Sequence, residues 1–337
     1  MIPNVCDYKK EEIVDILLRE EYGYLPPAPL SVRAELTERD KRFCAGKAEL
    51  EIYKLICDCP FGEFSFPIRV VIPKAGRPVP AFVHINFRPD VPDKYQPTEE
   101  LVDAGYAVIS FCYEEVSSDN GDFTNGLAGL VYPEGKRAPD SCGKIGLWAW
   151  AAMRVLDWAL TLDSLDHSRI SVTGHSRLGK TALLTGMLDE RFYCAFSNDS
   201  GCAGASIARD NDGETVKKIV DRFPYWFCEN YYKYSDNEET MPFDQHFLVA
   251  ANYPHRVYVA SAEDDAWACP RNEFLACTLA GEYYKKLGGV GFPENDGMPE
   301  CGKPILGGDI GYHIRHGLHY QSREDWKYYI EFLEKSN

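Results

Sequence analysis

Short apolar runs alternate with helical patterns along most of the chain after residue 80. AFVHINF (81–87) and YAVISFCY (106–113) are nearly continuous apolar runs, as expected of strands buried on both faces of a parallel sheet. Segments 98–104 and 146–160 have the apolar spacing of helices. This alternation predicts an α/β fold in which helices cover both faces of a doubly wound, mostly parallel sheet, a three-layer sandwich.

The remaining patterns extend this arrangement in both directions along the chain. We predict helices over 8–21, 273–288 and 325–335, strands over 194–199 and 257–262, and a hairpin of 48–57 with 64–72 at a sheet edge.

The segments between these elements are less regular. Residues 114–144 and 289–310 are rich in turn-forming residues and are expected to be loops. The aromatic and charged segment 202–246 is expected to be an inserted helical cap. Because the chain contains no repeat and no low-complexity linker, we expect residues 1–337 to form a single domain, in which residues 1–75 supply an N-terminal helix and hairpin.

Charge and composition narrow the class of protein. The 337 residues carry a net charge of −16 without a basic block, so neither nucleic acid nor membrane is an expected partner. No run of 18 apolar residues predicts a transmembrane helix, and the N-terminal residues lack the pattern of a signal peptide. Twelve cysteines are dispersed from Cys6 to Cys301 without a Cys-x-x-Cys pair, which favours free thiols in a reducing compartment. These features predict a cytoplasmic protein; a leader removed before residue 1 would leave the same pattern.

The stretch RISVTGHSRLGKTALL (169–184) is the strongest candidate for catalytic chemistry. A β-prone run stops at Gly174, Ser176 follows at a tight turn, and a helical pattern begins by Lys180. This layout holds a nucleophile above a parallel sheet, although the usual spelling is G-x-S-x-G and here the second glycine is Gly179, with Leu178 in the usual place. The alternative interpretation is an ordinary turn with a helix-capping serine.

A serine nucleophile needs a histidine base and a carboxylate that orients it. In α/β-hydrolases the chain order is Ser, acid, His, with the acid and the base in loops after late strands. Three histidines lie in a predicted loop between the last predicted strand and the final helix: His313, His316 and His319. Glu263, Asp264 and Asp265 follow the strand 257–262, and Asp199 stands at the end of the strand 194–199.

The motif GHSRLGK (174–180) resembles the G-C-S-R-x-G-K signature of the glucuronoyl esterases, carbohydrate esterase family 15. The similarity to the bacterial branch covers the chain from about residue 80 onward, in the segments IGLWAWAAMRVLDW, SNDSGCAGA, FPYWFCENY, PFDQHFLVA, ASAEDDAWACP and YHIRHGLHYQSREDW. The chain departs from the family at His175, where Cys is usual, and at Cys269, where Asp is common. The resemblance implies the α/β-hydrolase fold.

The resemblance also implies roles for individual residues. Ser176 matches the nucleophile, His319 matches the base in an H-x-R-x-G-x-H pattern, and Arg177 matches a residue of the oxyanion hole. Three further residues match groups that contact the sugar: Lys180, Glu214 and Trp267. The alternatives to sugar contact are structural: Lys180 could simply solvate the first turn of the helix, and Glu214 could cap a helix. His175 is expected to be a packed neighbour of the nucleophile.

The identity of the acid is the open question of this site. Family members place the acid at a position matched either by Asp199 or by Asp265. We predict Asp265, which also fits the general α/β-hydrolase position, with Asp199 as the alternative. No metal and no organic cofactor are expected.

These observations predict a serine esterase that cleaves an ester on the carboxyl group of (4-O-methyl)glucuronate through an acyl-enzyme. The expected partner is therefore a small-molecule or oligosaccharide ester. One alternative is an acetyl esterase acting on xylan-derived sugars. Another, from a different class, is a carbohydrate-binding protein on an inactivated hydrolase fold. The oligomeric state is not predicted.

Overall fold

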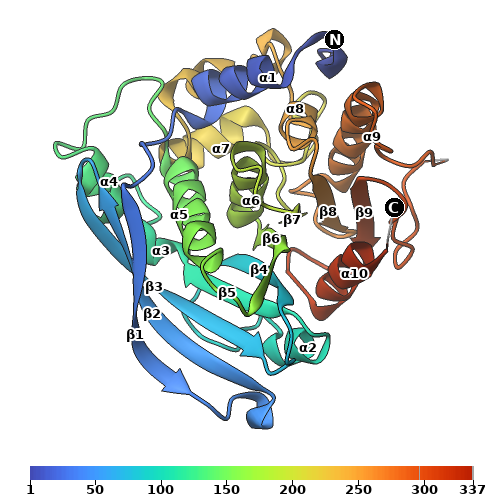
Figure 1. Ribbon diagram of the computed structural model, residues 1–337. Helices are drawn as coiled ribbons and strands as arrows, with labels where there is room; N and C mark the ends of the chain where they lie inside the picture. The colour runs from blue at the N-terminus through green and yellow to red at the C-terminus, as the bar shows by residue number, and fades with distance from the viewer. Residues whose placement is uncertain (296, 336–337) are drawn as a thin grey trace.

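A computed structural model describes residues 1–295 and 297–335, and its strands form one nine-stranded sheet (Figure 1). The order across the sheet is β1-β2-β3-β5-β4-β6-β7-β8-β9. The strands are β1 (Ser31–Asp40), β2 (Ala48–Cys59), β3 (Gly62–Pro73), β4 (Val79–Asn86), β5 (Ala107–Cys112), β6 (Leu165–His175), β7 (Cys194–Asn198), β8 (Arg256–Ala262) and β9 (Ile310–Arg315). The six strands from β5 to β9 across the sheet are parallel, which confirms the predicted fold class.

Successive residues of the central strands point into two separate cores. On β4, Val83 belongs to the larger core while Phe82 belongs to the smaller one. The larger core lies under α5 (Lys144–Ala159), α6 (Arg177–Leu188), α8 (His246–Ala250) and α9 (Pro270–Lys286). The smaller core lies under α2 (Thr98–Asp103) and α10 (Arg323–Glu334), where Phe82 meets Trp326 edge to face. Two-sided burial explains why these strands are apolar throughout.

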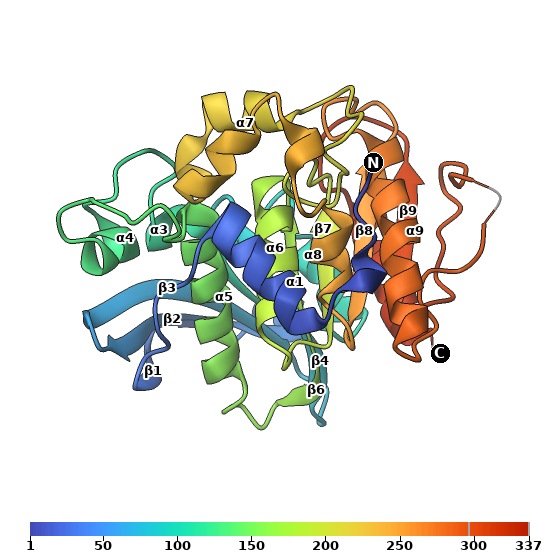
Figure 2. The same ribbon diagram turned by 90° about the horizontal axis from the view of Figure 1, so that it is seen from above.

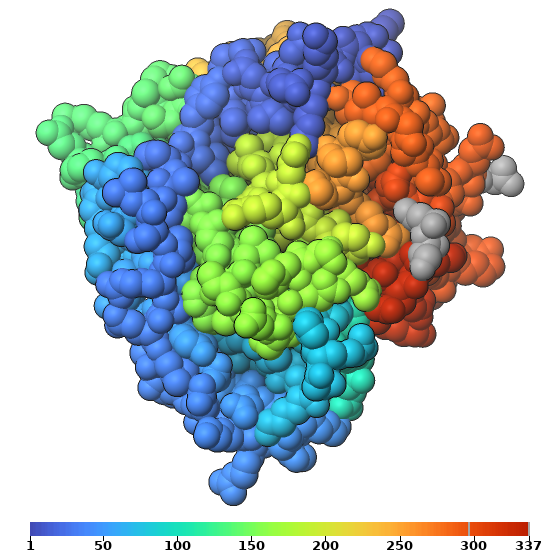
Figure 3. All heavy atoms as spheres, in the orientation of Figure 1, coloured from blue at the N-terminus to red at the C-terminus, as the bar shows by residue number. Residues whose placement is uncertain are grey.

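The N-terminal part differs from its prediction in two ways. The hairpin of β2 and β3 is present, but β1 lies outside it and forms the sheet edge (Figure 1). Figure 3 shows the blue N-terminal residues on the surface at the lower left. Most residues of β1 are exposed, so its sequence carries little of the apolar pattern that reveals a strand. The first helix is α1 (Lys10–Leu17), which continues as a π-helical turn over Leu18–Tyr22 and packs against α8.

Two predicted loops contain regular structure. Residues 114–144 include most of α3 (Tyr113–Val116) and all of α4 (Gly126–Val131). The prediction that His313 lies in a loop is wrong, because His313 is fully buried in β9. The sequence of β9 was hard to interpret because its polar side chains are paired inside the protein: His313 bonds Tyr258 and Asp325.

The segment 202–246 contains α7 (Val216–Arg222) and 3-10 turns at Pro224–Trp226, Glu229–Tyr234 and Glu238–Thr240. Figure 2 shows this segment along one edge of the molecule, next to α5 and α6. Within the part of the chain that the structure describes, no helix is long and apolar enough to cross a membrane.

Candidate active site

Ser176 occupies a strained turn between β6 and α6. Its φ of 58° and ψ of −125° lie in a region that residues other than glycine rarely adopt. Such strain persists only where the surroundings impose it, and it is concentrated at functional sites. The turn places the Ser176 side chain at the carboxyl edge of the parallel strands.

The spacing of the two glycines follows from how α6 packs. A Cβ on Gly174 would lie 2.2 Å from the carbonyl oxygen of Leu178, so no side chain fits there. A Cβ on Gly179 would lie 3.1 Å from the carbonyl oxygen of Asn198, because α6 approaches β7 closely at this point. Leu178, at the usual glycine position, is fully buried in the larger core. The second glycine is therefore required one residue later.

The four predicted triad candidates meet at one edge of the sheet. Ser176, Asp199, Asp265 and His319 follow the ends of β6, β7, β8 and β9, and carboxyl ends of parallel strands share an edge. A cavity of about 210 Å³ lies there, lined by Ser176, Arg177, Lys180, Asp199, Ser200, Gly201, Glu214, Arg222, Phe223, Trp226, Trp267, Ala268 and His319. Its volume is below the roughly 300–1,000 Å³ of pockets for drug-sized ligands, which suits a ligand of about one sugar unit.

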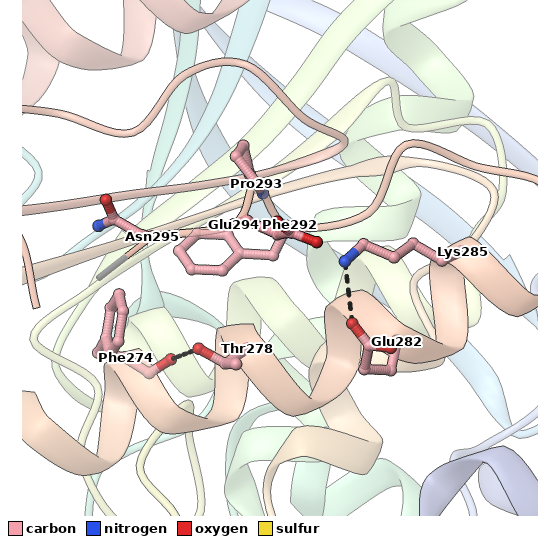
Figure 4. A pocket seen from close by; sticks show the side chains of 8 residues that line it. All are labelled: Phe274, Thr278, Glu282, Lys285, Phe292, Pro293, Glu294 and Asn295. Carbon is pink, nitrogen blue, oxygen red and sulfur yellow. Dashed lines mark hydrogen bonds and ion pairs between the residues drawn. The ribbon is translucent and has the colours of Figure 1, made fainter. Parts of the chain in front are cut away.

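A second, larger cavity lies on α9, and its lining of described residues includes neither a serine nor a histidine. Figure 4 shows it between α9 and residues 292–295, with an ion pair of 3.0 Å between Lys285 and Glu282 on its wall. The residues that line it, all within the described chain, include no serine, cysteine or histidine. The smaller cavity, which Ser176 and His319 line, is therefore the candidate functional site.

His319 is hydrogen-bonded to the predicted acid. The distance from His319 Nδ1 to Asp265 Oδ2 is 2.6 Å, and Asp265 Oδ1 accepts a bond of 3.3 Å from the Ala268 N–H. The Asp265 side chain is 4% exposed and the His319 ring 41% exposed. With Nδ1 engaged by the carboxylate, Nε2 is the ring atom left for other partners.

Asp199, the alternative acid, makes different contacts. Its Oδ2 accepts bonds of 3.2 Å from Arg315 Nη2 and 3.3 Å from the Tyr320 N–H, while Oδ1 has no hydrogen-bond partner among the described residues. Burial, and then the charges of Glu273 and Asp325, raise the pKa of Asp199 well above its usual range. Asp199 therefore holds the loop that carries His319 rather than the imidazole itself.

Arg177 is fixed beside Ser176 by an ion pair and by aromatic rings. Its guanidinium pairs with Asp119 and lies 4.6 Å from the ring centroid of Trp226. Asp119 also accepts bonds of 2.7 Å from Trp226 Nε1 and 3.0 Å from the Tyr113 hydroxyl. Asp119 was missed in the sequence because one acid in a polar loop carries no distinguishing pattern.

Lys180, Glu214 and Trp267 form a connected group on the cavity wall. Lys180 Nζ donates to the carbonyl oxygens of Ser200 and Cys202 and lies 3.3 Å from Glu214 Oε2. Glu214 Oε1 accepts a 3.0 Å bond from Trp267 Nε1. The buried lysine thus holds the carboxylate of Glu214 in place, while Trp267 is 44% exposed at the mouth of the cavity.

The segment 202–246 contributes residues that sequence reasoning did not single out. Phe223 and Trp226 stack with ring centroids 3.9 Å apart, and both line the cavity with Arg222. Within the described residues Arg222 has no ion-pair partner. The aromatic richness of the segment was visible in the sequence, but which rings face the cavity depends on the fold.

The other two histidines after β8 lie outside this cavity. His313 is buried between the Tyr258 hydroxyl, 3.0 Å from Nδ1, and Asp325, 2.8 Å from Nε2. His316 is exposed and bonds Glu263 at 2.7 Å.

The chain is similar to known proteins over most of its length. The family model described as "Glucuronyl esterase, fungi" matches residues 62–288, more than half of the chain. The chain belongs to the glucuronoyl esterase family.

Relatives of several kinds share this family. Carbohydrate esterase MZ0003, from an unknown prokaryotic organism, is 38% identical over 238 residues, which is 70% of this chain and 55% of that protein. The 4-O-methyl-glucuronoyl methylesterase of Podospora anserina is 27% identical over 313 residues, 88% of this chain and 60% of that protein. The chain therefore spans somewhat over half the length of these curated relatives. A solved glucuronoyl esterase from Solibacter usitatus superimposes with a TM-score of 0.90 at 29% identity, over 99% of this chain and 97% of that one.

The chain departs from the usual glucuronoyl esterase residues at His175 and Cys269, and the structure shows the contacts of both. His175 bonds Asn198 Oδ1 through Nδ1 at 2.6 Å, and its ring centroid lies 4.4 Å from that of His319. Burial, and next the neighbouring His319, lower the pKa of His175 well below its usual range, so the ring packs as a neutral group. Cys269 precedes α9 and makes no side-chain capping bond; Pro270 begins that helix instead.

The polar residues around Asp199 include a fully buried glutamate on α9. Glu273 accepts bonds of 2.9 Å from the Gly201 N–H and 2.6 Å from the Ser261 hydroxyl, and lies 3.3 Å from the Ser200 hydroxyl. Burial raises the pKa of Glu273 to about 7 from 4.5. Its bonds hold residues 200–201, which line the cavity, against β8.

Replacing Glu273 by Gln should stabilise the protein increasingly as the pH rises. The folded protein keeps a proton that the unfolded chain loses above pH 4.5, so this group's contribution is complete below pH 4.5 and is lost as the pH rises to about 7. The loss is about 1.4 kcal/mol per pH unit across that interval, whereas a Gln amide stays neutral. Thermal unfolding at pH 5 and pH 8 should show the Tm difference growing in favour of Glu273→Gln.

The matched control is Glu282→Gln, an exposed glutamate on the same helix. This variant should leave the pH dependence of Tm unchanged. A Tm difference for Glu273→Gln that is the same at both pH values would contradict the assigned ionisation.

Proposed function

We propose that this protein is a glucuronoyl esterase, which hydrolyses the ester on the carboxyl group of 4-O-methyl-glucuronate. The proposal rests on the strained Ser176 turn, which lies at the edge of a sugar-sized cavity. His319 lines the same cavity and is bonded to Asp265. We take the substrate class from the similar protein of Podospora anserina, a 4-O-methyl-glucuronoyl methylesterase.

In this proposal His319 is the general base. Asp265 accepts the Nδ1–H of His319, so the lone pair of the neutral ring is on Nε2, and His319 and Ser176 line the same cavity. His319 takes the hydroxyl proton as Ser176 Oγ attacks the ester carbonyl carbon. The imidazolium that forms is stabilised by the buried Asp265 carboxylate, 2.6 Å away.

The negative charge that develops on the carbonyl oxygen falls beside the start of α6. The first N–H groups of a helix have no acceptor within the helix and can donate to that oxygen. The Arg177 guanidinium adds a permanent positive charge. Asp119 and Trp226 restrict where the guanidinium can lie, so less reorganisation is needed when the oxyanion forms.

The sugar would occupy the wall formed by Lys180, Glu214 and Trp267. All N–H bonds of the Lys180 ammonium are directed to protein acceptors, so we infer that Lys180 acts by orienting Glu214. Glu214 would accept hydrogen bonds from sugar hydroxyls, and Trp267 would offer an apolar face to the ring. The alcohol leaves with the proton from His319, and water, activated by the same histidine, then cleaves the acyl-enzyme.

Hydrolysis of benzyl glucuronate, measured alongside acetylated xylo-oligosaccharides, tests the substrate class. We expect turnover of the glucuronate ester and a loss of roughly 10³-fold or more in kcat for Ser176→Ala. Turnover of the acetyl ester alone would instead identify an acetyl esterase. Absence of both activities, with ligand affinity unchanged in Ser176→Ala, would identify a carbohydrate-binding protein.

The acid is tested by comparing two single variants. Asp265→Asn should lower kcat by roughly 10³- to 10⁴-fold, because the amide favours the wrong tautomer of His319. Asp199→Asn should lower kcat far less, since Asp199 contacts Arg315 and Tyr320 rather than the imidazole. Thermal unfolding of each variant is the control and should show that both are folded. The reverse ranking of kcat between folded variants would assign the acid to Asp199.

A further inference from the structure

A second carboxylate–histidine pair lies on the same two loops as Asp265 and His319, outside the cavity lining. His316 Nδ1 is 2.7 Å from Glu263 Oε2. Cys301, in the segment between α9 and β9, joins this pair: one ligand atom from each of the three side chains lies within 4.8 Å of the others. Figure 1 shows this segment projecting at the right of the molecule, beside β9.

Backbone hydrogen bonds bring the three segments together. The Glu263 N–H donates to the Arg315 carbonyl at 2.8 Å and the Asp264 N–H donates to the Gly317 carbonyl at 3.0 Å, which joins the loops after β8 and β9. The Gly302 N–H donates to the Ile314 carbonyl at 3.2 Å, which holds Cys301 against the end of β9. These main-chain bonds fix the relative positions of the three segments that carry the side chains.

The surroundings favour a cation. Glu263, Glu324 and Asp264 place negative charge near the Cys301 thiol. The same negative charges would attract a metal ion, and a bound ion would in turn favour the thiolate. The His316 and Glu263 side chains are 81% and 53% exposed, so both can adjust their rotamers around an ion.

We propose that Glu263, Cys301 and His316 bind a divalent zinc-type cation, with water as the fourth ligand. One thiolate sulfur, one imidazole nitrogen and one carboxylate oxygen are donors that Zn²⁺ takes in tetrahedral sites. Calcium and magnesium prefer sets made only of oxygen, so they fit this trio poorly. The sequence spacing concealed the site because its three ligands come from three separate segments.

A bound ion would connect the loops of the catalytic pair. Glu263 lies two residues before Asp265, and His316 lies three residues before His319. The ion would therefore restrain the relative movement of these two loops. This consequence for catalysis rests on the proposed function, whereas metal binding itself does not.

Titration with Co²⁺, which substitutes for Zn²⁺ and absorbs light, tests the site. The wild-type protein, kept reduced with a phosphine, should develop a thiolate-to-cobalt band that saturates at one equivalent, and Zn²⁺ should abolish the band. Cys301→Ser should remove the band, and His316→Ala should weaken binding at least tenfold. Cys44→Ser, which removes a comparably half-buried thiol, is the matched control and should keep it.

The active site is a competing place for the ion, because ligand atoms of Asp199, Asp265 and His319 also lie within 4.8 Å of one another. That trio contains no thiol, so His319→Ala should keep the cobalt–thiolate band. Saturating Zn²⁺ should raise the Tm of the wild type by a few degrees and leave that of Cys301→Ser unchanged. A wild-type protein without a thiolate band, or a band that persists in Cys301→Ser, would overturn the proposal.

Discussion

The buried guanidinium of Arg315 holds together the part of the molecule that carries His319, the proposed base. It bonds both carboxylate oxygens of Asp325 at 3.0 Å, approaches Asp199 at 3.2 Å, and donates to the carbonyl oxygens of His316, Leu318 and Tyr320. Removing one partner of such a buried pair typically costs about 3–5 kcal/mol. One side chain at the end of β9 thereby fixes the start of α10, the end of β7 and the loop that presents His319.

Two carboxylates at equivalent positions after adjacent strands have different partners in this arrangement. Asp199 follows β7 and is used by Arg315, while Asp265 follows β8 and reaches His319 Nδ1. Both are buried, yet only Asp265 contacts the imidazole with a hydrogen-bonded oxygen. Because the bonded oxygen of Asp199 faces the guanidinium, Asp199 anchors the loop, while Asp265 is the acid that contacts the ring of the proposed base, His319.

Much of the fold and of the candidate site could be predicted from the sequence. The wrong and the missed predictions have physical causes. The buried parallel strands and the Ser176 turn were predictable because two-sided burial and a strand–turn–helix junction leave local patterns. His313 was misplaced because a polar side chain satisfied inside a strand looks like a loop residue. β1 was missed because an exposed edge strand lacks the apolar pattern. Arg222 was missed because only the fold brings it to the cavity, and Asp119 because only the fold brings it to Arg177.

The loops after β8 and β9 carry two acid–histidine pairs of nearly equal length that differ in environment. The inner pair, Asp265 with His319, has a carboxylate that is 4% exposed, whereas both members of the outer pair, Glu263 with His316, are mostly exposed. A desolvated carboxylate interacts strongly with a charge that forms on its neighbour, while an exposed pair contributes little. The inner pair is therefore suited to stabilising a transient imidazolium. The outer pair gains a comparable interaction only when a cation joins it, and Cys301 is placed to complete that coordination.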